Sequence, residues 1–115
     1  MPEFDRIVSR LREFTAEREW GQFHDPKNLA MLLGSEAGEL TALLRWIPNG
    51  ESDAFVRSEA HRAEVEGEVA DVAIALLLFC DRAGIDLARV VEAKIARNAE
   101  RYPVERSRGH ARRPR

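Results

Sequence analysis

Two pairs of acidic residues, each spaced three apart, stand inside the two most apolar segments of this chain. The first pair is Glu36 with Glu39, and the second is Glu68 with Asp71. Residues at i and i+3 share one face of a helix, so each pair would direct two carboxylates the same way. A carboxylate in apolar surroundings is costly unless a positive charge meets it. Two such helices packed face to face would bring four carboxylates to one point, which favours a site for a hard divalent cation.

The prediction of a cation site rests on the apolar surroundings of these pairs and not on how many pairs there are. Twenty acidic residues in a chain of 115 would give about three i,i+3 pairs by chance. The first pair lies within the largely apolar segment 29–40, and the second directly precedes residues 72–80, all of which are apolar. Most Asp and Glu side chains lie on solvated faces, but such a face is not expected within these two segments.

The donor set narrows the identity of the cation. Carboxylates alone suit Mg²⁺ or Mn²⁺. Di-iron bundles use Glu-x-x-His, and none of the three histidines, His24, His61 and His110, stands three residues after a helical Glu. Zinc is disfavoured as well, because its usual Cys/His ligand spacing is missing. Since Mg²⁺ commonly works together with substrate phosphates, four carboxylates indicate phosphoryl-type chemistry on a polyphosphate.

A polar stripe near the end of the chain could hold those phosphates. Its members fall at i, i+4, i+7 and i+8 of one helix face: Lys94, Asn98, Arg101 and Tyr102. Lys, Arg and Asn can donate hydrogen bonds to phosphate oxygens. A solvated polar face near a helix C-terminus, where cations are favourable in any case, explains the same residues. The spacing alone does not decide between these two interpretations.

Aromatic side chains near the acids could hold a nucleobase. Trp46 stands seven residues after Glu39, on the same face and about 10.5 Å along the helix, which is roughly the reach from a metal-bound phosphate to a base. Trp20 and His24, in the preceding loop, could complete an aromatic slot, because aromatic faces stack on bases. A tryptophan more often packs in a core than it serves as a ligand platform. Small residues beside the acids, Ser35 and Gly38, leave room for a ligand.

Helical periodicity occurs four times along the chain, with no strand-type alternation and no repeat. The predicted helices are an amphipathic stripe over residues 4–14, a second from its cap Asp25 to about Ile47, a third from its cap Ser58 to before Gly84, and a fourth from its cap Asp86 to Pro103. A polar link over roughly residues 48–57 separates the second helix from the third. These patterns predict an all-α fold built on a four-helix protomer.

The third predicted helix also bears on assembly. Because every residue from Val72 to Cys80 is apolar, no side of this helix is left for water. A lone bundle of 115 residues would struggle to cover such a helix. We therefore expect an oligomer, most simply a symmetric dimer.

Composition and termini place the chain in a broad class. Its 44% hydrophobic and 33% charged residues are typical of a single helical domain. Cys80, the one cysteine, indicates a small core residue in a reducing compartment. No apolar stretch is long enough to span a membrane, and the N-terminus lacks the features of a signal peptide. We expect a cytoplasmic protein with no membrane partner.

The charge is unevenly distributed along the chain. Residues 104–115 carry five Arg against one Glu, whereas residues 1–103 have a net charge of −6. We therefore predict an acidic folded domain over residues 1–103, followed by a basic tail over residues 104–115. The tail could contact nucleic acid, but its near lack of apolar residues favours a solvated, disordered terminus.

Taken together, these motifs resemble a known family. Glu36-x-x-Glu39, followed after 28 residues by Glu68-x-x-Asp71, is similar to the metal-binding signature of the all-α nucleotide pyrophosphohydrolases of the MazG type. Residues 94–103 resemble that family's motif on its fourth helix. Residues 14–24 and 27–29 resemble the dCTP pyrophosphatase branch. The resemblance covers about residues 10–103 and rests on the combination of motifs.

The resemblance implies a helical protomer that dimerises, often further into a tetramer, with Mg²⁺ or a substituting Mn²⁺ in each site. It implies hydrolysis of a nucleoside triphosphate, with a dCTP-like pyrimidine as the first choice, to the monophosphate and pyrophosphate. Carried over residue by residue, it implies Glu36, Glu39, Glu68 and Asp71 as metal ligands, Lys94, Asn98 and Arg101 with neighbouring Tyr102 at the phosphates, and Trp20, His24 and Trp46 around the base. Glu39 is also our candidate for orienting the attacking water.

One position departs from the pattern of the dCTP branch. An aromatic residue often stands there one turn after the Asp of the second motif, where this chain has Ala75. The resemblance therefore leaves the base and sugar preference open.

Two other classes of protein compete with the nucleotide hydrolase. One is a non-enzymatic helical dimerisation module, whose acids are solvated or paired with Arg. The other is a nucleic-acid-binding protein that acts through residues 104–115. Neither explains carboxylates kept inside apolar helices, so hydrolysis of a nucleotide is the preferred prediction and a nucleic-acid partner is not expected.

Overall fold

The computed structural model describes residues 2–111. The elements are, in chain order, α1 (Pro2–Glu17), η1 (Trp20–Phe23), α2 (Pro26–Leu44), η2 (Asn49–Glu51), α3 (Ser52–Arg57), α4 (Arg62–Ala83), α5 (Leu87–Arg101) and α6 (Val104–Ser107). No strand occurs within residues 2–111, so the predicted all-α class is confirmed. The four predicted helices are present, and α3 and α6 are additional short ones. The chain divides into two compact units, and the boundary between them in the sequence falls between Gly84 and Ile85.

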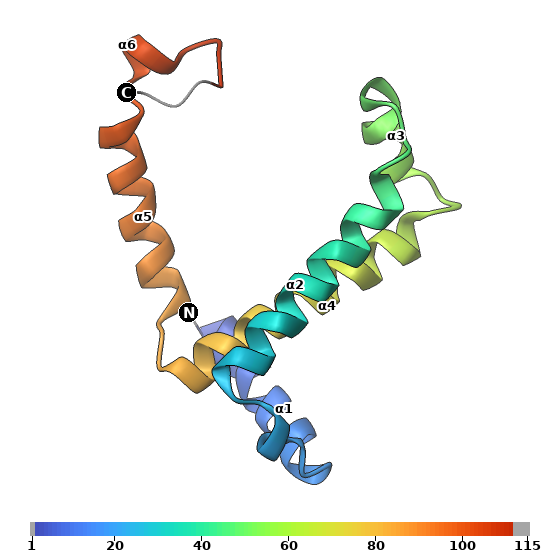
Figure 1. Cartoon of the computed structure of the whole chain (residues 1–115), viewed down its shortest axis with the longest axis vertical. Helices are drawn as coiled ribbons and strands as arrows, with labels where there is room; N and C mark the ends of the chain where they lie inside the picture. Colours follow the sequence, from blue (N-terminus) through green and yellow to red (C-terminus); the bar gives the residue numbers. More distant parts are fainter. Residues whose placement is uncertain (1, 112–115) are drawn as a thin grey trace. The chain divides into compact units, whose positions relative to one another are not determined.

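The first unit is built on α2 and α4, which run side by side in opposite directions (Figure 1). The short α3 joins their far ends, while α1 and η1 lie at the other end of the pair (Figure 1). The buried apolar residues all come from the two long helices: Leu29, Val65, Ala75, Leu77 and Cys80. No residue of α1 is buried. The core of this unit is therefore the seam between α2 and α4.

The predicted start of α2 is confirmed in detail. The Asp25 side chain accepts a hydrogen bond from the backbone N–H of Asn28 at 2.8 Å, and Pro26 occupies the first helical position. This arrangement satisfies one of the donors left unpaired at a helix start. The Asn28 amide donates in turn to the Phe23 carbonyl at 2.9 Å, so the end of η1 is fastened to the first turn of α2.

The connection between α2 and α4 differs from the prediction. Instead of one loop, it contains η2 and α3. Ser58 was predicted to cap the long helix, but it is the C-cap of α3, and its hydroxyl donates to the Phe55 carbonyl at 2.9 Å. The long helix therefore begins only at Arg62, after His61. The rings of Phe55 and His61 stack with centroids 4.3 Å apart, and this contact folds the connection back onto α4.

Three further helix ends agree with the sequence. Gly84 ends α4 with a φ of +69°, in the left-handed region that glycine adopts most easily. Asp86 caps α5, and its side chain accepts from the backbone N–H of Arg89 at 3.2 Å. α5 ends at Arg101, before Pro103.

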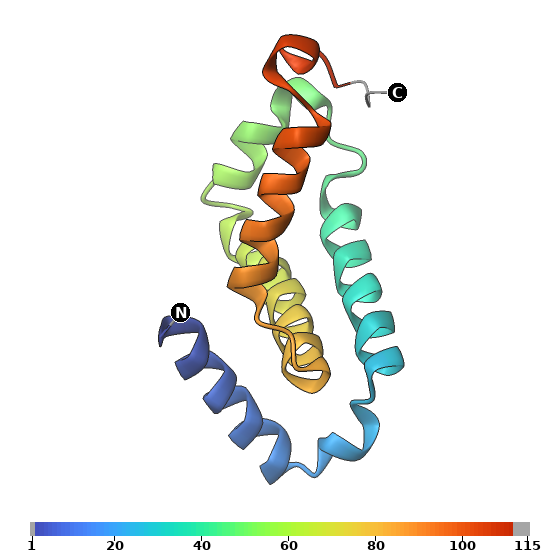
Figure 2. The same cartoon turned by 90° about the vertical axis from the view of Figure 1, so that its left-hand side faces the viewer.

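The second unit holds α5 and α6. No residue of α5 is buried. Figure 2 shows α5 leading into the short α6. The predicted basic tail thus begins with one helical turn, Val104–Ser107, and its last residues, 112–115, lie outside the described part of the chain. None of the described helices has the length and apolar character that a membrane span requires.

Candidate functional site

The four acidic residues singled out in the sequence come together in the first unit. Glu36 and Glu39 lie on α2, and Glu68 and Asp71 lie on α4. Each offers one carboxylate oxygen, and these four oxygens lie within 4.8 Å of one another. Because each pair already shares a helix face, the packing of α2 against α4 is sufficient to assemble the group. We call these four residues the carboxylate cluster.

Two members of the carboxylate cluster are partly buried and uncompensated. Glu36 and Glu68 are half-buried, whereas Glu39 and Asp71 are exposed. One oxygen of each half-buried residue, Oε2, is buried without a hydrogen-bond partner. None of the ion pairs within residues 2–111 neutralises the cluster. Buried polar atoms are nearly always satisfied in folded proteins, so these two oxygens could accept a hydrogen bond or ligate a cation.

The ionisation of the cluster follows from the same geometry. Burial raises the pKa of Glu36 above its ordinary value, and the negative charges of Glu39 and Asp71 raise it further. Burial is also the main cause of the raised pKa of Glu68, to which its neighbours in the cluster again add. Both shifts express the cost of gathering negative charge away from water. A cation bound among the four side chains would remove that cost.

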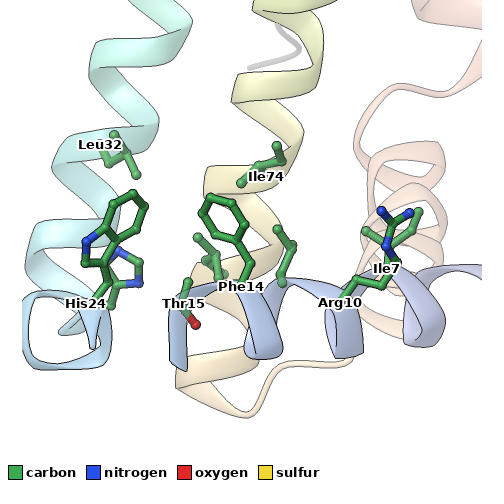
Figure 3. Close-up of a pocket in the computed structure, with 10 residues that line it drawn as sticks. Ile7, Arg10, Phe14, Thr15, His24, Leu32 and Ile74 are labelled. Atoms are coloured by element: carbon green, nitrogen blue, oxygen red, sulfur yellow. The ribbon is translucent and has the colours of Figure 1, made fainter. Parts of the chain in front are cut away.

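A cavity of about 400 Å³ lies in the same unit, between α1 and η1 on one side and the two long helices on the other (Figure 3). It is lined by Ile7, Arg10, Leu11, Phe14, Thr15, Trp20, His24, Leu32, Ile74 and Leu78. Two of the three aromatic residues predicted to surround a base, Trp20 and His24, belong to this lining. Their ring centroids are 6.4 Å apart at an interplanar angle of 64°. The cavity is therefore apolar and partly aromatic.

The cavity borders the carboxylate cluster along both long helices. Leu32 precedes Glu36 by four residues on α2, and Ile74 follows Asp71 by three residues on α4. At 1.5 Å per residue, each step is about one helical turn, or roughly 5 Å along the axis. The apolar cavity and the carboxylate cluster could therefore contact the two ends of one ligand.

Trp46, the third predicted aromatic residue, lies elsewhere. It follows the end of α2, is 82% exposed and does not line the cavity. The guanidinium of Arg45 lies 5.6 Å from the centroid of its ring. Along α2 the carboxylate cluster stands between Leu32 and Trp46. The structure thus brings Trp20 and His24 together and leaves Trp46 on the other side of the acids.

The predicted phosphate-binding stripe is a face of α5 in the second unit. Lys94, Asn98 and Arg101 are exposed, and Tyr102 is the half-buried C-cap of the helix. The Arg101 guanidinium lies 5.6 Å from the centroid of the Tyr102 ring. The helix itself therefore groups these side chains as the spacing predicted.

Ala75, where the sequence departs from the dCTP branch, is fully buried, with 0% of its surface exposed. It belongs to the core of the α2–α4 seam and does not line the cavity. Most of the cavity lining was not singled out in the sequence, because apolar residues such as Leu32 and Leu78 resemble ordinary core positions. The apolar stripe of α1 was the one available signal, since Ile7, Leu11 and Phe14 belong to it.

The protein has an all-α fold in which two antiparallel helices bring four carboxylates together. Comparisons with known proteins identify the family to which this fold and site belong. A family model described as "MazG-like family" matches residues 47–113. The chain belongs to the MazG-like family.

Individual relatives and a solved structure are similar over most of the chain. dCTP pyrophosphatase 1 of Bos taurus is 42% identical over 110 residues, and that of Homo sapiens is 40% identical over 111 residues; each match covers 96% of this chain. The chain spans 65% of the length of these curated relatives. A crystal structure of a pyrophosphatase from Archaeoglobus fulgidus matches with a TM-score of 0.81 and 37% identity, over 88% of this chain and 93% of that one.

Proposed function

We propose that this protein is a Mg²⁺-dependent nucleoside triphosphate pyrophosphohydrolase, which converts a (deoxy)nucleoside triphosphate, with a dCTP-like pyrimidine as the first choice, to the monophosphate and pyrophosphate. The observation that carries the proposal is the group of four carboxylate oxygens within 4.8 Å, two of whose residues bury an unpartnered oxygen. Relatives named dCTP pyrophosphatase 1 support the choice of reaction and substrate.

The carboxylate cluster fits the proposed metal. Its donors are oxygens only, which suits Mg²⁺ or Mn²⁺. Two oxygens that each lie about 2.1 Å from one Mg²⁺ can be up to about 4.2 Å apart, so a spread within 4.8 Å needs only small side-chain adjustments. Glu36, Glu39, Glu68 and Asp71 would hold the ion. When bound, Mg²⁺ would supply positive charge to the phosphates and to the departing pyrophosphate.

Glu39 is our candidate for the residue that orients the water. It belongs to the cluster yet is exposed, so one carboxylate oxygen can accept a hydrogen bond from a water molecule. The oriented water attacks the α-phosphorus, a new P–O bond forms, and the bond to the bridging oxygen breaks as pyrophosphate leaves. The proton of the water passes to a carboxylate.

The proposed phosphate contacts are the polar stripe on one face of α5 and the C-cap of that helix. Lys94 and Arg101 can donate charge-assisted hydrogen bonds to phosphate oxygens, and the Asn98 amide can donate a neutral one. Tyr102 completes the same stripe at the end of the helix. All four are substrate-binding residues in this proposal.

The cavity beside the cluster is the proposed place of the nucleobase. Its volume of about 400 Å³ falls in the range of small-molecule sites, which are concave and mostly apolar. Trp20 and His24 provide aromatic faces for a base. Trp46 is proposed as a further substrate contact, because its exposed ring is accessible to a ligand that extends past the cluster.

We further propose a homo-oligomer, a dimer or tetramer, as the working form. Apolar side chains are exposed on both units, among them Val69 at 50% on α4, and Val91 at 46% and Ile95 at 63% on α5. Exposed apolar side chains mark contact sites where they gather into a patch, and a second copy of the chain is the simplest symmetric partner to cover them.

The decisive experiment measures pyrophosphate and orthophosphate separately with dCTP, dUTP, dTTP and purine triphosphates, with Mg²⁺ and after its removal by EDTA. We expect pyrophosphate and monophosphate in equal amounts, and only with the metal. Turnover of none of these substrates would exclude the proposal and favour a helical dimerisation module. Release of orthophosphate instead would place the cleaved bond elsewhere.

A further inference from the structure

Helix α1 forms one wall of the cavity, yet apolar packing holds it only weakly. None of its residues is buried, and its two phenylalanines, Phe4 and Phe14, are 37% and 44% exposed. Helices normally owe their position to a buried apolar face. Individual polar contacts must therefore contribute more to the placement of α1 than they do for α2 or α4.

One such contact joins α1 to the last turn of α4. Arg12 Nε donates to both oxygens of Asp81, at 3.0 Å to Oδ2 and 3.1 Å to Oδ1, and the Arg12 Nη2 also donates to Oδ1. The side chain of Asp81 is only 25% exposed. A planar guanidinium that meets both oxygens of a carboxylate fixes orientation as well as distance.

The next residue of α4 holds the other part of the same wall. Arg82 donates through Nη1 to the backbone carbonyl of His24 at 3.1 Å, and His24 ends η1 as its C-cap. Two consecutive residues of α4, Asp81 and Arg82, therefore hold α1 and η1 respectively. Leu78, which lines the cavity, stands one turn earlier on the same helix.

Aromatic contacts join α1 to η1. The Arg18 guanidinium carbon lies 3.7 Å from the centroid of the Phe14 ring, and its Nη1 donates to the Phe14 carbonyl at 3.0 Å. The Phe14 and Trp20 rings meet edge to face with centroids 5.5 Å apart. Figure 3 shows Phe14 and Thr15 on α1, with Leu32 and Ile74 reaching from the two long helices. Any movement of α1 therefore changes the width of the cavity.

We propose that Asp81 and Arg82 are positioning residues, which set the width of the cavity by holding α1 and η1 against the end of α4, and thereby set its selectivity among nucleobases. The inference rests on the proposed function, because it takes the cavity as the place of the base. A radial gap of about 0.5–1 Å already loses a quarter to a half of a dispersion contact. If α1 and η1 moved outward by that distance, the cavity would make weaker contacts with a pyrimidine and would accommodate a purine more easily.

The test exploits charge reversal across the Arg12–Asp81 pair. Arg12→Asp and Asp81→Arg each place like charges opposite one another, and the double variant restores an attractive pair. A matched control reverses Asp53 and Arg57, an ion pair on α3 whose side chains are 91% and 72% exposed. Arg82→Met tests the second contact. If circular dichroism shows that a single-reversal variant does not fold, Arg12→Met is used in place of that variant, because it removes the ion pair without introducing repulsion.

The first readout follows the wall itself, without catalysis. In a Trp46→Phe background, Trp20 is the only tryptophan of the chain, and its quenching by acrylamide reports its exposure. We expect quenching to increase in each single reversal and in Arg82→Met, to return in the double reversal, and to stay unchanged in the control. Unaltered quenching in the folded single variants, or no recovery in the double variant, would overturn the positioning role.

The second readout is selectivity, measured with Trp46 in place. We expect the ratio of kcat/KM for dCTP over dATP to fall about fivefold or more in the single reversals and to recover in the double variant. A loss of rate that is equal for both nucleotides would overturn the inference about selectivity and leave the proposed function standing. Absence of turnover in the wild-type protein would overturn the proposed function instead, while the quenching result would still decide the placement of α1.

Discussion

Glu36 on α2 and Glu68 on α4 each bury one carboxylate oxygen that has no hydrogen-bond partner, and both residues belong to a cluster of four acids that each place a carboxylate oxygen within 4.8 Å of the others. Unpaired negative charge at the seam between α2 and α4 destabilises the folded protein. A divalent cation bound among the four carboxylates would offset this destabilisation.

Removing one charge from the cluster should stabilise the protein without metal and disable it as an enzyme. The pKa of Glu36 is raised in the folded state, so its ionised form opposes folding at neutral pH, and this penalty disappears as the pH falls through the raised pKa. We expect Glu36→Gln to melt at a higher temperature than wild type in EDTA and to lose at least about a hundredfold in kcat/KM. Full activity in Glu36→Gln or Asp71→Asn would contradict the metal assignment.

Binding of Mg²⁺ should stabilise the native protein by mass action. At a concentration 100 times the dissociation constant, the gain is about 2.7 kcal/mol, which thermal melts with and without MgCl₂ resolve. The gain should vanish in Glu68→Gln. Matched melts with NaCl at equal ionic strength control for screening, and equal shifts in both salts would favour the dimerisation module without a metal site.

The Arg12–Asp81 ion pair should make stability depend on pH in the acid range. The pKa of Asp81 lies below its ordinary value, chiefly because of its hydrogen bond from Arg12. The pair therefore contributes stability above the ordinary Asp pKa of about 3.9, and this contribution is lost as the pH falls through the lower folded value. Urea unfolding of wild type and Arg12→Met should differ at about pH 6 and converge in acid; a difference that persists there would assign the effect to packing.

Truncating the α5 stripe should weaken substrate binding. A hydrogen bond to a charged group is worth about 1.5–3 kcal/mol, so Lys94→Ala should lower kcat/KM by roughly ten- to a hundredfold. Arg89→Ala, another exposed basic residue of α5, is the matched control and should retain the wild-type value. Similar losses in both variants would point to general electrostatic attraction and against a phosphate contact at Lys94.

Replacing the two tryptophans separately should locate the base. Stacking of one base on an aromatic ring is worth about 1–3 kcal/mol, so Trp20→Leu should raise the KM for dCTP about tenfold. Trp46→Leu should have the smaller effect, because Trp46 does not line the cavity. If Trp46→Leu had the larger effect, the base would lie beyond the cluster, toward the end of α2.

Local features of this molecule could be inferred from single segments. Asp25 and Asp86 were identified as helix caps because a cap bonds to a backbone N–H only a few residues away. The same local logic was wrong for Ser58, since the carbonyl of Phe55 takes its hydroxyl as a partner. A serine can serve the helix before it or the helix after it, and only the folded connection selects one.

The acidic pairs and their shared helix faces were properties of the sequence, because the period of the α-helix relates residues three apart whatever surrounds them. Whether two such faces meet depends on the register of α2 against α4, and neither segment by itself predicts that register. Tertiary structure alone also placed Trp20 and His24 in one cavity without Trp46, and paired Arg12 with Asp81 across 69 positions of the chain. Contacts of that kind depend on how whole helices pack.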